Sequence, residues 1–142
     1  MILYSDTSAL IKLYLHEAES ELMLTEAKVA SVIAVCRITW AEAMAALARR
    51  AREVEVDSGV IEQARQRLQA HWARFAIVEV NQPLVELAGE HADTFSLRGY
   101  DSVQLAAACV LQTQTQEAVH FACFDKRLRK AAKILGMSTL GG

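Results

Sequence analysis

Four acidic residues lie at positions where a carboxylate can take part in chemistry. Asp6 and Asp125 each come directly after a short apolar stretch that is typical of a buried strand. Glu42 and Asp101 each lie in the first turn of a helix predicted from an alanine-rich segment. Each position also suits a structural role, because Asp is a favoured N-cap and an acid near a helix N-terminus contributes about 0.3–1 kcal/mol.

Together, the four carboxylates indicate a metal site. In a parallel α/β sheet, strand ends and helix starts lie on the same rim, where ligands bind. Carboxylates that converge there repel each other unless a cation neutralises them. Magnesium and manganese ions are bound in this way, through carboxylates and water. The four histidines are scattered without an HxxxH or HExxH pattern, so a softer metal is not indicated.

The elements that must position these acids alternate along the chain. The predicted strands are the apolar stretches Ile2–Ser5, Val29–Cys36, Ala76–Val80, Val119–Phe124 and Ser138–Leu140. The predicted helices are Thr7–Leu15, Ala18–Lys28, Thr39–Val54, Asp57–Phe75, Gln82–Ser96, Tyr100–Gln112 and Lys126–Leu135. This alternation predicts an α/β fold with a parallel sheet and right-handed crossovers. Other acids, such as Glu17, are expected on a solvated helix start.

Length and charge limit the classes of protein to consider. The chain has 142 residues, which suits a single domain spanning residues 1–142. Its 15 Lys and Arg residues against 17 Asp and Glu residues give a net charge of −2. This charge excludes a protein that coats nucleic acid non-specifically, which would carry a strong basic excess. It does not exclude an enzyme that holds nucleic acid locally and briefly.

The ends and the cysteines of the chain indicate its surroundings. The three cysteines, an odd number without a CxxC pair, are expected to be buried and reduced. The N-terminus lacks the basic region of a signal peptide, and no apolar run reaches the ~18 residues that span a bilayer. We therefore expect a soluble, cytoplasmic protein with no membrane association.

Four blocks of sequence resemble a known family. The apolar strand that runs into Asp6-Thr7-Ser8-Ala9-Leu10 resembles the opening of PIN-domain proteins of the VapC toxin type. Three further blocks follow in the family's order, at Thr39–Glu42, Leu97–Ala106 and Phe124–Leu128. The resemblance covers essentially the whole chain. It implies a three-layer PIN-like fold, in which about seven helices flank a parallel sheet of four to five strands in the order 3-2-1-4-5.

The resemblance also implies an activity and its residues. It implies a metal-dependent ribonuclease in which Asp6, Glu42 and Asp101 correspond to the core metal-binding acids. Asp125 corresponds to a fourth, less constant acid. Ser8 corresponds to a small hydroxyl near the first acid, where it either hydrogen-bonds a metal-bound water or stabilises the helix start. A cognate, VapB-like antitoxin and a homodimer are implied as partners.

One residue departs from the family's pattern. The family often has Thr or Ser two residues before its fourth acid, and this chain has Cys123 there. Because a thiol is a weak hydrogen-bond donor, we expect Asp125 to be oriented less firmly than the other three acids.

The mechanism that follows is hydrolysis of an RNA phosphodiester with one or two Mg²⁺ or Mn²⁺ ions as cofactor. Water attacks phosphorus and the 3′ oxygen departs, so the products carry 5′-phosphate and 3′-hydroxyl ends. Among the basic residues, Lys12 and Arg98 are expected to contact substrate phosphates, because they lie close to the acids in sequence.

Two other functions are compatible with part of this pattern. A receiver-like phosphoacceptor domain would need an acid pair after the first strand and a Lys after a late strand. Here Asp6 stands alone, and the third strand ends at Val80-Asn81 without a phosphoacceptor Asp. A catalytically inactive PIN-fold module that binds RNA or protein would not need all four acids. Metal-dependent RNA cleavage distinguishes the nuclease from this module.

Overall fold

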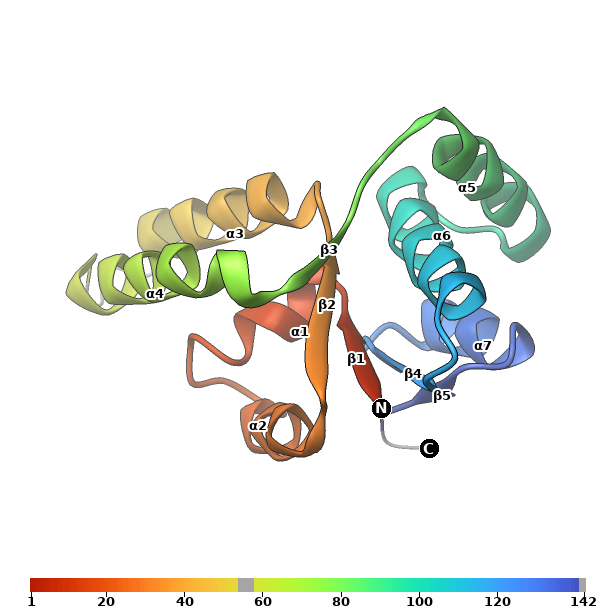
Figure 1. The fold of residues 1–142 in the computed structure, drawn as a ribbon. Coiled ribbons are helices and arrows are strands. Elements are labelled where there is room, and N and C mark those ends of the chain that lie inside the picture. Colours follow the sequence, from red (N-terminus) through yellow and green to blue (C-terminus); the bar gives the residue numbers. More distant parts are fainter. Residues whose placement is uncertain (54–57, 141–142) are drawn as a thin grey trace.

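A parallel β-sheet forms the centre of the computed structural model, which describes residues 1–53 and 58–140. Its strands are β1 (Ile2–Ser5), β2 (Val32–Cys36), β3 (Ala76–Val78), β4 (Val119–Ala122) and β5 (Ser138–Thr139). They lie in the order β3-β2-β1-β4-β5, and every neighbouring pair is parallel (Figure 1). The expected order 3-2-1-4-5 is confirmed, and the order reverses between β1 and β4.

Seven α-helices within the described residues cover both faces of the sheet. They are α1 (Thr7–Ile11), α2 (Ser20–Val29), α3 (Thr39–Glu53), α4 (Ser58–His71), α5 (Gln82–Phe95), α6 (Gly99–Gln114) and α7 (Lys126–Ile134). A short 3₁₀ turn, η1 (Trp72–Arg74), follows α4. Helices α1 to α4 lie on one side of the sheet and α5 to α7 on the other, which gives the expected three layers (Figure 1).

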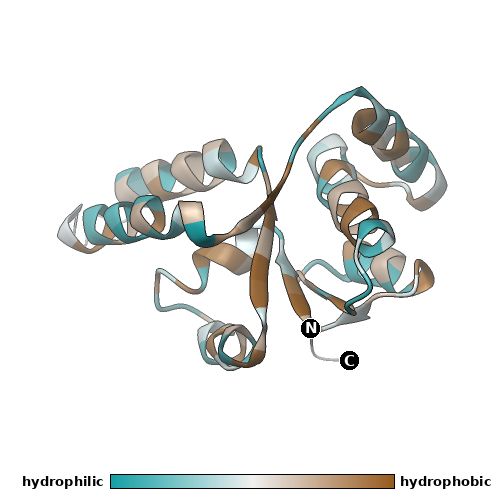
Figure 2. Ribbon diagram, viewed as in Figure 1, coloured by the Kyte–Doolittle hydropathy of each residue, from teal (hydrophilic) through white to brown (hydrophobic). Residues whose placement is uncertain are grey.

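The sheet is apolar on both faces because both are covered (Figure 2). Tyr4 of β1 and Phe121 of β4 are paired in register and stack, with ring centroids 5.5 Å apart. The middle of α6, from Leu105 to Ala108, is fully buried against this face, as its apolar sequence predicts. Cys36 and Cys123 are buried and Cys109 is half-buried, and all three are free thiols.

Several element boundaries differ from the prediction. α1 ends at Ile11, and residues 12–19 form turns, so α2 begins at Ser20. Val29 is the last residue of α2, so the predicted strand beginning at Val29 was wrong by three residues. β3 ends at Val78, because Asn81 caps α5 by accepting a hydrogen bond from the Leu84 amide, and the chain must turn before it. Val54, where one helix was predicted to end, and Asp57, where the next was predicted to begin, lie outside the described residues.

Candidate active site

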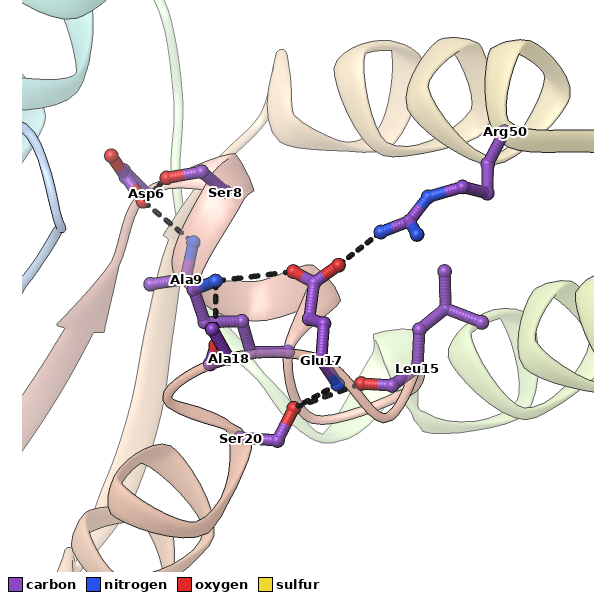
Figure 3. Close-up of polar contacts among 9 residues, drawn as sticks. Asp6, Ser8, Ala9, Leu15, Glu17, Ala18, Ser20 and Arg50 are labelled. Carbon is purple, nitrogen blue, oxygen red and sulfur yellow. Dashed lines mark hydrogen bonds and ion pairs between the residues drawn. The ribbon is translucent and has the colours of Figure 1, made fainter. Parts of the chain in front are cut away.

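Asp6 lies between the last residue of β1 and the first residue of α1. Its backbone amide donates to Ala122 of β4 at 3.1 Å, so the residue sits at the point where the strand order reverses. Its Oδ1 accepts hydrogen bonds from the Ala9 amide and from the Ser8 hydroxyl, both at 2.9 Å (Figure 3). Asp6 is therefore the N-cap of α1, and the Ser8 hydroxyl donates to its carboxylate.

The surroundings of Asp6 raise its pKa to about 6. Burial is the largest cause, because only 7% of the residue is exposed and the charged form is poorly solvated. The hydrogen bonds from Ala9 and Ser8 act in the opposite direction, and the nearby carboxylates of Asp101 and Glu42 raise the pKa further. The pKa of Asp6 thus reflects the proximity of Asp101 and Glu42 as well as its burial.

Glu42, in the first turn of α3, is held by a buried hydrogen-bond network. Its Oε1 accepts from the Thr7 hydroxyl at 2.7 Å and from the side-chain amide of Gln104 at 2.8 Å. Gln104 also donates to the Thr39 hydroxyl at 3.0 Å and accepts from the Tyr4 hydroxyl at 2.6 Å. Gln104 therefore links β1, α1, α3 and α6 behind the Glu42 carboxylate.

Sequence reasoning did not assign a role to Gln104. A signal was present, because Gln104 is the one polar side chain in the run from Val103 to Leu111 of a helix predicted to be buried. A buried amide requires hydrogen-bond partners, so its position predicts a polar network even where the partners cannot be named.

Asp101, in the first turn of α6, lies near one cation and one acid. Arg98 Nε is 3.6 Å from Asp101 Oδ2. The pKa of Asp101 is raised, chiefly by burial and also by Asp125, while Arg98 lowers it. Arg98 is 87% exposed, so it offers a mobile positive charge at the edge of the site.

Asp125 is the N-cap of α7. Its Oδ1 accepts from the Leu128 amide at 2.9 Å, and the Cys123 thiol contacts the Asp125 backbone carbonyl at 3.7 Å. The Cys123 thiol thus contacts the backbone of Asp125. The Asp125 carboxylate is oriented by α7, the helix that Asp125 caps.

A cleft of about 590 Å³ contains three of the four predicted acids. Asp6, Glu42 and Asp101 line it, together with Ser8 and Gln104. The remaining charged lining residues are Lys12, Glu17, Arg49, Arg50 and Glu53. Asp125 is not among the lining residues, although it is close enough to Asp101 to influence its pKa. The structure therefore brings the core acids together and leaves Asp125 at the margin.

Lys12 is largely buried, with 14% of its side chain exposed. Its Nζ is 3.2 Å from Glu17 Oε1, donates to the Ala18 carbonyl at 2.9 Å, and lies 5.0 Å from the centre of the Phe124 ring. The ammonium group is thus engaged by protein groups on several sides.

Glu17 is a charged residue of the cleft that sequence reasoning placed wrongly. It was expected at a solvated helix start, but α2 begins at Ser20, so Glu17 lies in the preceding turn. Only 21% of its side chain is exposed, and it forms ion pairs with Lys12 and with Arg50, the second of which is drawn in Figure 3. The Arg50 partner lies on α3, 33 residues away in sequence, and local spacing cannot reveal such a contact.

The donor set of the cleft suits a hard divalent cation. Carboxylates line it and no histidine or cysteine does, which is the ligand type of Mg²⁺ and Mn²⁺. The raised pKa values of Asp6 and Asp101 show a local excess of poorly solvated negative charge that a cation would relieve. Within residues 1–53 and 58–140, however, no three His, Cys, Asp or Glu side chains converge closely enough to enclose one ion.

The fold and site define a class of protein: an open parallel α/β sheet with carboxylates in a cleft at its switch point. The order of its strands also differs from the 2-1-3-4-5 order of receiver-like sheets, which removes that alternative. The PIN domain family matches residues 3–134, and the chain belongs to this family. The resemblance drawn from the four sequence blocks is thereby confirmed.

Relatives with assigned names share nearly the whole length of the chain. Ribonuclease VapC46 of Mycobacterium tuberculosis is 30% identical over 138 residues, covering 97% of this chain and 95% of that protein. Ribonuclease VapC45 of the same species is 29% identical over 135 residues, covering 95% and 92%. A chain of a toxin-antitoxin complex from Klebsiella pneumoniae has the same fold, with a TM-score of 0.61 at 19% identity over 88% of this chain and 87% of that one.

In the part of the chain that the structure describes, no helix is both long and apolar enough to cross a bilayer.

Proposed function

We propose that this protein is a metal-dependent endoribonuclease that hydrolyses RNA phosphodiester bonds and acts as the toxin of a toxin-antitoxin pair. The observation that carries the proposal is that Asp6, Glu42 and Asp101 line the same cleft of a PIN-domain chain. The VapC relatives, which are named ribonucleases, support RNA as the substrate.

The side chains proposed to hold one or two Mg²⁺ or Mn²⁺ ions are Asp6, Glu42 and Asp101, with Asp125 at the margin. When bound, such an ion supplies a water of lowered pKa and a positive charge near the leaving oxygen. Two of the ligands are fixed beforehand, Asp6 by Ala9 and Ser8 and Glu42 by Thr7 and Gln104. Fixed donors need little rearrangement at the moment of reaction.

The identity of the attacking group determines the ends of the RNA products. In the proposed mechanism no side chain attacks phosphorus, and no lysine or histidine activates the ribose 2′-hydroxyl. Water attacks phosphorus and the ribose 3′ oxygen departs, so the products carry 5′-phosphate and 3′-hydroxyl ends. Arg98, exposed beside Asp101, is suited to contact a phosphate of the bound strand.

The comparisons also support one protein partner. The fold is shared with a chain of a toxin-antitoxin complex, which supports a cognate, VapB-like antitoxin for this protein. A homodimer is part of the proposal and is tested by its mass in solution.

The test is RNA cleavage by the purified protein with Mg²⁺ or Mn²⁺ and with EDTA. We expect cleavage only with metal, products that a 5′-phosphate-dependent exonuclease degrades, and loss of activity in Asp6→Asn. Asp93→Asn, an exposed acid on α5 outside the cleft, is the matched control and should remain active. RNA binding without cleavage under all of these conditions would favour the inactive PIN-fold module, and 2′,3′-cyclic phosphate ends would contradict the mechanism.

A further inference from the structure

The cleft continues beyond the carboxylates along one face of α3. Its lining residues on this helix recur at helical spacing, and they are Glu42, Ala45, Ala46, Arg49, Arg50 and Glu53. Between the acidic and basic parts the helix contributes only alanine methyl groups. Because an α-helix rises about 1.5 Å per residue, Arg49 and Arg50 lie about 10–12 Å along the axis from Glu42.

Arg50 differs from Lys12 in how much of it a ligand can reach. Arg50 is 40% exposed and lines the cleft, whereas the Lys12 ammonium is enclosed by Glu17, the Ala18 carbonyl and the Phe124 ring. Among the described residues, Glu17 is the hydrogen-bonding partner of the Arg50 guanidinium. A guanidinium carries five N–H donors in a planar fork, so binding one carboxylate leaves donors for an anion.

The loop that carries Glu17 is itself tied down. The Ser20 hydroxyl accepts from the Glu17 amide at 3.0 Å and donates to the Leu15 carbonyl at 3.0 Å (Figure 3). Lys12 binds the other oxygen of the same carboxylate. Glu17 is therefore held by its backbone and by its side chain, and it restricts Arg50 to one side of the cleft.

We propose that Arg50 is the contact for a backbone phosphate flanking the scissile bond, and that Glu17 is the positioning residue that orients Arg50 for it. This inference rests on the proposed function, because it assumes an RNA strand in the cleft. A planar guanidinium matches the geometry of a phosphate, and orienting it in advance lowers the entropy lost on binding. The floor of Ala45 and Ala46 gives the strand a path from the carboxylates to Arg50.

The test measures binding of a fluorescein-labelled, mixed-sequence single-stranded RNA by anisotropy across a range of salt concentrations. All proteins carry Asp6→Asn, so that the RNA is not cleaved. Arg50→Gln should weaken binding several-fold and reduce the slope of log affinity against log salt by about 0.7, the contribution of one phosphate on a single strand. Arg65→Gln, on α4, is the matched control, because Arg65 also pairs with a glutamate, Glu62, but lies outside the cleft.

A double-mutant cycle separates positioning by Glu17 from its charge. Glu17→Ala removes a negative charge in any background, but it removes the orientation of Arg50 only where Arg50 is present. Glu17→Ala changes the free energy of RNA binding in both backgrounds. We expect this change to be less favourable when Arg50 is present than in the Arg50→Gln background. An equal effect in both backgrounds, or tighter binding confined to the Arg50 background, would show that Glu17 merely opposes or competes with phosphate.

A variant that leaves Glu17 intact provides an independent measurement. Arg50→Lys keeps the charge without the planar fork, so it should weaken binding while it retains most of the salt slope. If Arg50→Gln and Arg65→Gln give the same affinity and slope, the inference is wrong although the nuclease proposal stands. If the unsubstituted protein neither binds nor cleaves RNA, the proposed function is wrong and the inference falls with it.

Discussion

Asp6 combines two roles that have opposite requirements. As the N-cap of α1 it needs only a hydrogen-bond acceptor for the Ala9 amide, which an amide oxygen also provides. As a proposed cation ligand it needs a charge, which burial makes unfavourable in the absence of the cation. We therefore expect the charge of Asp6 to lower the stability of the metal-free protein.

The first prediction concerns Asp6→Asn without metal. Because the pKa of Asp6 is raised to about 6 from 3.8, the folded protein binds this proton more tightly than the unfolded chain. The unfolding free energy should therefore fall as pH rises from about 4 to about 6, and then level off. At pH 8 in EDTA, Asp6→Asn should be more stable than the unsubstituted protein by up to about 3 kcal/mol, and the gain should shrink towards pH 4.

Urea denaturation across this pH range checks the prediction, with Asp93→Asn as the control that should show no such gain. A stability difference between Asp6→Asn and the unsubstituted protein that does not change with pH would contradict it. Added Mg²⁺ should raise the stability of the unsubstituted protein more than that of Asp6→Asn.

The second prediction concerns Gln104. Replacing it with Leu leaves Glu42, Thr39 and the Tyr4 hydroxyl without a shared buried partner, which costs about 1–3 kcal/mol for each unsatisfied group. Glu42 keeps its hydrogen bond from Thr7, so roughly two groups lose a partner, and we expect Gln104→Leu to lower the unfolding free energy by about 2 kcal/mol or more. The variant should also impair cleavage, because Glu42 is no longer held in place by Gln104. Tyr4→Phe, which removes a single hydroxyl from the same network, should cost less and leave cleavage largely intact. Urea denaturation and initial cleavage rates of the two variants measure both effects.

At the scale of elements, the cleft depends on which face α3 presents. The same spacing that brings Glu42 and Arg50 to the cleft brings Ala45 and Ala46 between them. Buried residues at other positions of the helix, such as Ala43 and Leu47, face the core. α3 thus separates a packing face from a functional face, and the small side chains on the functional face keep the cleft open.

The third prediction is that Ala45→Leu closes this path. Ala45 is exposed, so a larger side chain there should change the unfolding free energy by no more than about 0.5 kcal/mol. It should raise the KM for RNA by roughly tenfold, because the strand can no longer lie along the helix. Ala41→Leu is the control, since Ala41 is exposed on the same helix but does not line the cleft. Equal KM values for the two variants would show that the strand does not follow α3.

The elements could be predicted from sequence because their signals are local. Apolar β-branched runs give the strands, and Asp6 and Asp125, which suit N-caps by sequence, do cap α1 and α7. The placement of Glu17 and Gln104 could not be predicted, because their partners lie on other elements. Arg50, the partner of Glu17, is 33 residues away, and Glu42, a partner of Gln104, is 62 residues away. Such contacts depend on how the helices pack against the sheet, and spacing along the chain does not encode that.

At the scale of the whole molecule, the charge of the protein is unfavourable for its proposed substrate. The net charge is −2, and the cleft itself is lined by Asp6, Glu17, Glu42, Glu53 and Asp101 against Lys12, Arg49 and Arg50. A polyanion therefore meets a cleft with an excess of negative charge. Two divalent ions would change the net charge from −2 to +2 and would place the added positive charge beside the acids.

The last prediction is that RNA affinity depends on divalent metal. Binding of labelled single-stranded RNA is measured with Ca²⁺, a hard cation that prefers the same oxygen ligands, and with EDTA, and a gel verifies that the RNA stays intact. Affinity should be substantially higher with Ca²⁺ for the unsubstituted protein, and this gain should be lost in Asp6→Asn and kept in Asp93→Asn. Ionic strength is matched between the two conditions, because added salt by itself weakens phosphate contacts. Equal affinity with and without the cation would mean that Arg50, Arg98 and the other basic residues suffice to hold RNA, and that the acids of the cleft do not recruit metal for binding.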